Sequence, residues 1–260
     1  MPYALITGGS KGIGKEIAFE LAKRKSDILL VARSEEELKT TAEEIKAKYS
    51  VKVEFLALDL IKPDACKELL SWCTQNQFTI NTLVNNAGYA VWGYFEKLDI
   101  QAQKDMMQLN MTTLVELTHL FIPMLKTQSK SYILNVSSTT AYQAIPTLSV
   151  YAATKAFVLL FSRGLRFELQ NTPISVTCLS PGATTSNFTN RAGMQAMQAM
   201  AEKFNMDPKV VAQMGVNAML KEKAEIITGL VNVVSARAAN FLPKSIIEKI
   251  AANLYLKYLK

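Results

Sequence analysis

A glycine-rich turn between an apolar stretch and a helical one constrains the fold of this chain most. Residues 3–6 predict a short strand, and residues 15–25 carry apolar side chains at helical spacing. The turn between them has the sequence Thr7-Gly8-Gly9-Ser10-Lys11-Gly12-Ile13-Gly14. Glycines let a backbone approach a pyrophosphate closely, and the free N–H groups of a helix start attract its charge. The unit predicts a dinucleotide site, with a flexible turn as the alternative, and its expected cofactor contacts are Gly8, Ser10, Lys11, Gly12, Ile13 and Gly14.

Further apolar segments repeat this arrangement along the 260 residues of the chain. We expect strands over residues 3–6, 27–32, 51–58, 80–84, 133–137, 174–179 and 225–229, with helices between them. Such alternation predicts an α/β fold, in which helices cover both faces of one doubly wound parallel sheet. Ligands then bind at the carboxyl ends of the strands. We expect residues 1–260 to form a single domain.

The end of the second expected strand indicates which dinucleotide is bound. NAD-binding proteins usually place an acidic residue there, which contacts the adenosine ribose hydroxyls. Here the strand ends at Ala32 and Arg33 follows. A guanidinium can hold a 2′-phosphate, and Lys11 in the glycine turn could reach the same group. These residues favour NADP(H) over NAD(H); the alternative for each is a solvated surface charge.

Other strand ends carry polar or small residues. Asp59 follows the third expected strand, where it could hydrogen-bond an adenine amino group or cap the next turn. Ser34 and Glu37 have the spacing of a capping box at the start of the helix after the second strand. Small residues at a strand end let a cofactor pass close to the backbone. The further cofactor contacts that we predict are Leu60, Asn86, Ala87, Gly88, Pro181, Gly182 and Thr184.

The stretch Ser137–Lys155 follows the fifth expected strand and continues into a helix. Tyr151 and Lys155 are four residues apart, so they share one face of that helix. Ser138 lies just past the strand end, so a hydroxyl, a phenol and an ammonium converge on one point. A Ser/Thr-rich loop before a helix with a half-buried tyrosine is the alternative. Asn110 lies inside a long helical segment, residues 99–126, where an amide is costly unless it is hydrogen-bonded.

Composition excludes several classes of protein. The net charge is +7, but the lysines are spread along the chain, so a nucleic-acid surface is not indicated, and an anionic cofactor or substrate explains part of the excess. Three scattered cysteines and one histidine, His119, predict neither a disulfide framework nor a metal site. Reduced thiols suggest a cytoplasmic protein. We expect no signal peptide and no transmembrane segment.

With these motifs assembled, the chain resembles the short-chain dehydrogenase/reductase family over residues 3–190. The resemblance rests on Thr7–Gly14, on Asn85–Gly88, on the spacing of Ser138 and Tyr151, and on Pro181-Gly182. It implies a Rossmann domain whose sheet has seven parallel strands in the order 3-2-1-4-5-6-7. It also implies a nicotinamide cofactor, a small-molecule carbonyl or alcohol substrate, and a homodimer or homotetramer.

The resemblance also implies a role for each residue of the catalytic set. Tyr151 would be the general acid, and the Lys155 ammonium would lower the pKa of the phenol from its usual value of ~10 and hold the nicotinamide ribose. Ser138 would polarise the substrate carbonyl. Asn110 would anchor a water that connects Lys155 with solvent, and Thr184 would approach the nicotinamide carboxamide.

The resemblance places a substrate lid at residues 186–222, where methionines suit an adaptable apolar pocket, although a plain packed helix is equally consistent. After the seventh expected strand the chain departs from the family pattern. We expect residues 230–260 to form a helical extension, and Pro243 to open its last helix. One face of that helix carries apolar side chains with lysines beside them, namely Ile246, Ile247, Ile250, Leu254 and Tyr258. This face would dock on the core or on a second subunit, or else lie on a membrane surface.

These observations predict an oxidoreductase that transfers hydride between NADP(H) and a fairly apolar carbonyl or alcohol. Two alternatives remain: an NADPH-binding sensor without turnover, and a peripheral membrane enzyme that reduces lipid-derived ketones.

Overall fold

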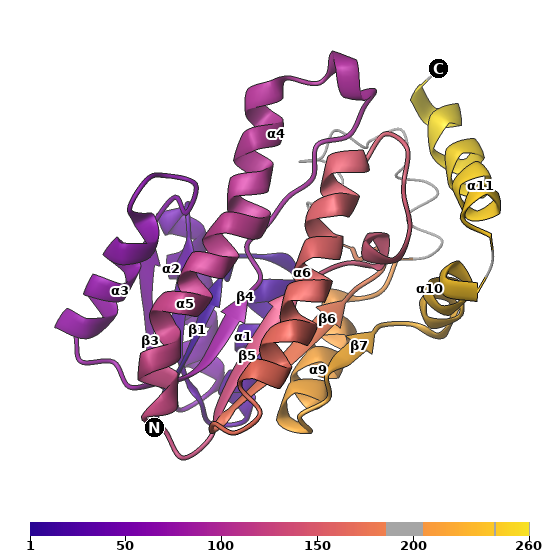
Figure 1. Cartoon of the computed structure of the whole chain (residues 1–260). Helices are drawn as coiled ribbons and strands as arrows, with labels where there is room; N and C mark the ends of the chain where they lie inside the picture. Colours follow the sequence, from indigo (N-terminus) through magenta and orange to yellow (C-terminus); the bar gives the residue numbers. More distant parts are fainter. Residues whose placement is uncertain (186–204, 242, 260) are drawn as a thin grey trace.

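Seven parallel strands form one sheet in the order β3-β2-β1-β4-β5-β6-β7 (Figure 1). The structure is a computed structural model that describes residues 1–185, 205–241 and 243–259. The strands are β1 (Tyr3–Thr7), β2 (Asp27–Ala32), β3 (Val53–Ala57), β4 (Ile80–Asn85), β5 (Ser131–Val136), β6 (Ile174–Ser180) and β7 (Glu225–Ile227). The predicted fold and strand order are therefore confirmed, and the strand boundaries differ from the predicted ones by a few residues.

Helices cover both faces of the sheet, because its central strands are apolar on both sides. One layer consists of α1 (Gly12–Lys23), α2 (Glu35–Lys48) and α9 (Pro208–Leu220). The opposite layer consists of α3 (Ala65–Gln75), α5 (Thr113–Lys126) and α6 (Ser149–Glu168). Cys66, Cys73 and Cys178 are buried free thiols in this core.

The helical segment predicted over residues 99–126 contains a change of winding. It consists of α4 (Ile100–Met107), a π-helical turn η2 (Gln108–Thr112) and α5. Asn110 lies in the π-helical turn and is buried. Single π-turns inside α-helices often mark functional sites, because the widened turn redirects a side chain.

The predicted lid, residues 186–222, is described only in part. Residues 186–204 lie outside the described residues, and α9 belongs to the core, where Val211 and Val216 are buried beside α1. Short 3₁₀ turns lie elsewhere: η1 (Phe95–Lys97), η3 (Thr139–Tyr142) and η5 (Lys257–Leu259).

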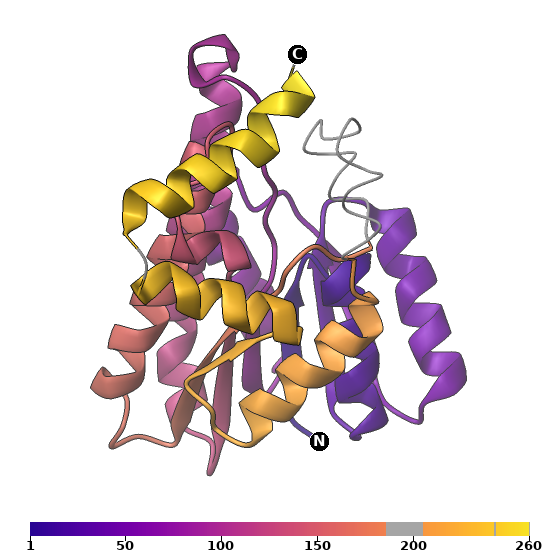
Figure 2. The ribbon, with the colours of Figure 1, turned by 90° about the vertical axis from the view of Figure 1, so that its right-hand side faces the viewer.

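The C-terminal extension forms two helices, α10 (Leu230–Phe241) and α11 (Lys244–Leu256). They lie outside β7 at one edge of the sheet, and Figure 2 shows them crossing in front of it. Tyr255 of α11 packs against a small apolar cluster that contains Leu148 and Tyr151. The last helix therefore docks on its own core, one of the alternatives that its sequence left open. In the part of the chain that the structure describes, no helix is long and apolar enough to span a bilayer.

Candidate active site

Gly8 and Gly14 of the turn Thr7–Gly14 occupy positions with no room for a side chain. Gly8 has φ +65°, a left-handed conformation that favours glycine. A Cβ at Gly14 would collide with the Gly8 carbonyl oxygen. Asn86, at the end of β4, donates from its amide to the carbonyls of Thr7 and Gly8 at 2.8 and 3.1 Å. The turn is therefore held in one conformation with its backbone exposed to a ligand.

Helix α1 begins beside this turn without a side-chain cap. Lys11 occupies the cap position in an extended conformation, its side chain does not cap the helix, and no acidic residue lies in the first turn. The first N–H groups and the positive end of the helix dipole are left for an anion. A pyrophosphate fits this arrangement of backbone and helix.

A cavity of about 1220 Å³ lies at the carboxyl ends of the strands and connects the glycine turn with the serine–tyrosine–lysine set. Every site residue predicted from the sequence lines it, with the exception of Asn110. Residues from distant parts of the chain thus meet in one place, as a doubly wound sheet requires.

Tyr151 and Lys155 share one face of α6 and are both buried, and Ser138 lies opposite them at the end of β5. The Ser138 hydroxyl hydrogen-bonds the phenol of Tyr151. The Lys155 Nζ lies 5.8 Å from the centre of the Tyr151 ring and donates to the Val136 carbonyl at 3.0 Å. The three groups converge as predicted.

Burial controls the protonation of this set. It raises the pKa of Tyr151, and the Ser138 hydrogen bond lowers it by less. Burial also lowers the pKa of Lys155 to about 8. Desolvation is the largest effect, so the net direction of the Tyr151 pKa is upward. Tyr151 is therefore a protonated phenol at neutral pH, the form that a proton donor needs. The lowering of this pKa by the Lys155 ammonium stays a prediction.

Asn110 lies behind the cavity. Its Oδ1 accepts from the Tyr89 N–H at 3.1 Å, and its Nδ2 donates to the Tyr89 carbonyl and to Thr154 Oγ1 at 3.0 and 3.1 Å. A Cβ at Gly88 would lie 2.9 Å from Asn110 Oδ1 and 3.4 Å from Lys155 Nζ. The absence of a side chain at Gly88 therefore leaves room for the Asn110 amide oxygen, and Lys155 Nζ lies at ordinary contact distance from the same position. These hydrogen bonds offset the free-energy cost of burying the Asn110 amide. Its role in anchoring a water stays a prediction.

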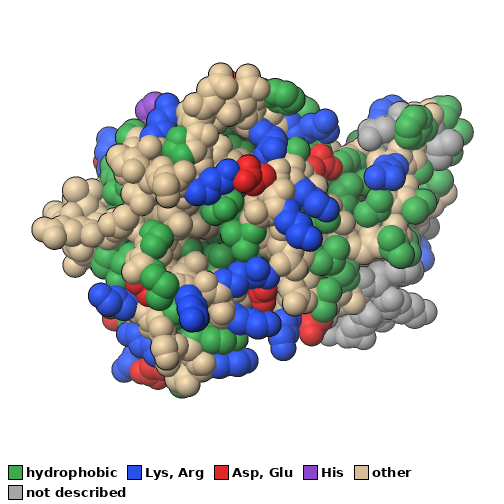
Figure 3. Space-filling model, turned by 90° about the horizontal axis from the view of Figure 1, so that it is seen from below, with side chains coloured by type: hydrophobic (Ala, Val, Ile, Leu, Met, Phe, Trp, Pro, Cys, Tyr) green, Lys and Arg blue, Asp and Glu red, His purple; other side chains and the backbone are tan. Residues whose placement is uncertain are grey.

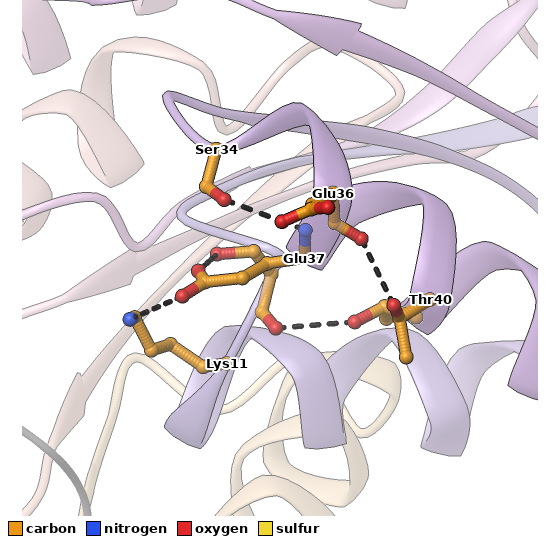
Figure 4. Close-up of polar contacts among 7 residues, drawn as sticks. Lys11, Ser34, Glu36, Glu37 and Thr40 are labelled. Carbon is orange, nitrogen blue, oxygen red and sulfur yellow. Dashed lines mark hydrogen bonds and ion pairs between the residues drawn. The ribbon is translucent and has the colours of Figure 1, made fainter.

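Lys11 and Arg33 both line the cavity, but Lys11 already has a carboxylate partner. Glu37 accepts from Lys11 Nζ at 2.8 Å and from the Ser10 hydroxyl at 3.1 Å (Figure 4). Ser34 accepts from the Glu37 N–H, which is half of the predicted capping box. The Glu37 side chain itself turns toward the glycine loop, a contact that the sequence did not indicate.

Asp59 and Thr184 also occupy the cavity wall. Asp59 accepts from the Ile61 N–H at 3.2 Å, so it caps the turn after β3, one of its two predicted roles. The Thr184 hydroxyl donates to the Gly182 carbonyl at 3.0 Å. The adenine and carboxamide contacts stay predictions.

The wall near Tyr151 comes from the C-terminal helices. Ile247, Ala251 and Tyr255 of α11 line the cavity, and Ile250 and Leu254 lie at its exposed edge. A Cβ at Gly182 would collide with Asn232 of α10, so this helix also approaches the strand ends. The signal for this wall was the apolar face of the last helix. Among the described residues, no group of His, Cys, Asp or Glu could hold a metal ion.

These features define a class of protein: a doubly wound nucleotide-binding domain with a tyrosine–lysine pair in its ligand cavity. The family model for short chain dehydrogenases matches residues 2–197, so the chain belongs to this family.

Relatives and solved structures agree with this assignment. The chain is 36% identical to a very-long-chain 3-oxoacyl-CoA reductase of Rattus norvegicus, over 69% of this chain and 58% of that protein. It is 28% identical to the human 17-beta-hydroxysteroid dehydrogenase type 3, over 99% and 82% of the two chains. A short-chain dehydrogenase from Sphingobium yanoikuyae in complex with NADPH superposes with a TM-score of 0.81, at 28% identity, over 93% and 95%. The chain thus spans less than two thirds of the length of the reductase it matches.

Proposed function

We propose that this protein is an NADP(H)-dependent carbonyl reductase that acts on a fairly apolar small molecule. The observation that carries the proposal is a cavity in which an uncapped helix start and glycine turn meet a buried Ser138–Tyr151–Lys155 set. When bound, the dinucleotide supplies the hydride.

The chain's own residues would do the rest. The Tyr151 phenol would donate a proton to the carbonyl oxygen, and the Ser138 hydroxyl would hydrogen-bond that oxygen and orient it. Lys155 would bind the nicotinamide ribose and stabilise the phenolate formed after proton transfer. The apolar wall from α11 would exclude water from this reaction and select apolar substrates.

Two observations support NADP(H) rather than NAD(H). Arg33 and Lys11 line the cavity beside the end of β2, and Ala32 occupies the position where NAD-binding proteins usually carry an acid. The related dehydrogenase of Sphingobium yanoikuyae was solved with NADPH.

A substrate panel tests the proposal. The names of the relatives suggest 3-oxoacyl thioesters of increasing chain length and 17-ketosteroids, next to small polar ketones as the matched control. We expect NADPH oxidation with an apolar member of the panel and a much lower kcat/KM with the polar ketones. Tight NADPH binding without turnover on any member would favour the sensor instead.

Exposed apolar side chains on α10 support a peripheral membrane location as well. Leu230 and Phe241 are each 86% exposed, and Val234 lies between them on the same helix. Arg237 and Lys244 are exposed nearby, a combination that suits an anionic lipid surface. Hydrophobic side chains gather at the right of Figure 3, where these helices lie.

Vesicle flotation tests this location. We expect the full chain to float with vesicles that contain phosphatidylserine, and less with phosphatidylcholine alone. A variant with Leu230→Ser, Val234→Ser and Phe241→Ser should lose flotation. The control Leu160→Ser with Phe167→Ser changes exposed apolar residues on α6 and should keep it. Equal flotation of both variants would contradict the proposal. The cytoplasmic location and the homo-oligomer stay predictions.

A further inference from the structure

Glu37 is a carboxylate placed among the groups that a 2′-phosphate needs. It is the third residue of α2, its backbone N–H bonds the Ser34 hydroxyl, and its side chain crosses to the glycine turn. There one oxygen accepts from Lys11 Nζ at 2.8 Å and the other from the Ser10 hydroxyl at 3.1 Å. Figure 4 shows the carboxylate between α2 and the glycine turn.

The charges around Glu37 keep it ionised. The hydrogen bond from Lys11 lowers the pKa of Glu37, partial burial raises it by less, and the Ser10 hydroxyl and the Arg33 charge lower it further. The Lys11–Glu37 pair is solvent-exposed, with 55% and 41% of the two side chains accessible, so the pair is weak enough to be exchanged for another anion.

We propose that Glu37 is a specificity-determining residue that weakens the preference of this site for NADP(H) over NAD(H). This inference rests on the NADP(H) dependence proposed above. Glu37, Lys11, Ser10 and Arg33 all line the same end of the cavity. A phosphate that binds Lys11 and Ser10 must displace the carboxylate and stays close to its negative charge. An unphosphorylated ribose leaves the Lys11–Glu37 pair intact, so only the phosphorylated cofactor meets this opposition.

Equilibrium binding tests the inference without turnover. Dissociation constants for NADPH, NADH and 2′,5′-ADP would be measured by calorimetry for the wild type, Glu37→Gln and the control Glu36→Gln. Both variants remove one negative charge from the first turn of α2, but Glu36 does not line the cavity. We expect Glu37→Gln to tighten NADPH and 2′,5′-ADP about fivefold to tenfold, and to change NADH less than twofold. Glu36→Gln should change all three less than twofold.

Lys11→Ala shows whether Glu37 acts through the lysine. We expect this variant to weaken NADPH more than NADH, and Glu37→Gln to tighten NADPH by a smaller factor when Lys11 is absent. A Glu37→Gln protein with the wild-type NADPH/NADH affinity ratio, or with weaker NADPH binding, would overturn the inference alone. A wild type that binds neither dinucleotide would instead overturn the proposed function and this inference with it. Thermal melting of each variant separates misfolding from altered binding.

Discussion

The two ends of the ligand cavity are built in different ways. At the cofactor end, backbone and buried hydrogen bonds determine the shape: Asn86 fixes the glycine turn, and no Cβ fits at Gly14. At the substrate end, apolar side chains of α11, such as Ile247 and Tyr255, form the wall. At Gly8 and Gly14 the first end tolerates almost no added side chain, because a Cβ there would collide with backbone or with the Asn86 amide. The second can change size through single side chains, and the names of two relatives, a 3-oxoacyl-CoA reductase and a hydroxysteroid dehydrogenase, point to different substrates for those proteins.

Tyr151 lies where the two ends meet, so its substitution is expected to have the largest effect. Tyr151→Phe removes the proton donor, and the expected loss in kcat is about 10³-fold. The NADPH dissociation constant should stay within about twofold, which calorimetry checks. Tyr94→Phe, at an exposed tyrosine, is the matched control and should keep its activity. A Tyr151→Phe enzyme with the wild-type rate would show that another group donates the proton.

Gly14→Ala tests the rigidity of the cofactor end. The new Cβ would collide with the Gly8 carbonyl oxygen, so we expect a loss of about 2–3 kcal/mol in the free energy of unfolding and of more than tenfold in dinucleotide affinity. Gly164→Ala on α6 is the control, because a Cβ there meets nothing within 4 Å. It should raise stability by about 0.5–1 kcal/mol, as alanine does in a helix. Urea unfolding measures the stability of both variants and the wild type. If Gly14→Ala were as stable as the wild type, the turn could relax around the new Cβ.

The pH dependence of stability tests how strongly burial lowers the pKa of Lys155, which lies where the two ends of the cavity meet. Its pKa is lowered to about 8 in the folded protein and is ~10.4 in an unfolded chain, so the unfolded state binds more protons between these values. Stability of the wild type should therefore rise with pH from about 8 to 10.4. Lys155→Met lacks this gain. The free energy of unfolding of the variant, relative to that of the wild type, should therefore fall by on the order of 3 kcal/mol across that window. Urea unfolding at both ends of the window measures it, and a constant difference would place the ammonium in contact with water.

Ile247→Ala tests the adaptable end and has the smallest expected effect. Ile247 is 9% exposed and lines the cavity, whereas its neighbour Ile246 is 47% exposed and does not. We expect Ile247→Ala to lower kcat/KM for an apolar ketone about tenfold, because apolar contact with the substrate is lost. Ile246→Ala should change it less than twofold, and neither should alter the NADPH dissociation constant. Equal effects of the two substitutions would show that Ile247 of α11 does not contact the substrate.

The features that follow from local sequence patterns could be predicted, and those that depend on the assembled cavity could not. Strand order, the glycine turn and the convergence of Ser138, Tyr151 and Lys155 follow from local patterns and from the geometry of a parallel sheet. The apolar face of α11 showed that this helix docks, but an amphipathic pattern does not say on which surface.

Two features of the site depend on surroundings that the sequence does not display. Glu37 has the spacing of a capping box, and that spacing says nothing of Lys11, which lies 26 residues away. The net direction of the Tyr151 pKa depends on how deeply the phenol is buried, which the lysine four residues on does not indicate. Both are properties of the assembled cavity rather than of any one segment.

Transfer of deuterium tests the account most directly, because it requires both ends of the cavity at once. NADPH carrying deuterium at the transferable position of its nicotinamide would be incubated with an apolar ketone, and the alcohol would be analysed by mass spectrometry. We predict one deuterium at the carbinol carbon of the alcohol formed by the wild type, and about 10³-fold slower formation of that alcohol with Tyr151→Phe. Unlabelled alcohol, or tight NADPH binding with no alcohol from any ketone of the panel, would contradict the account.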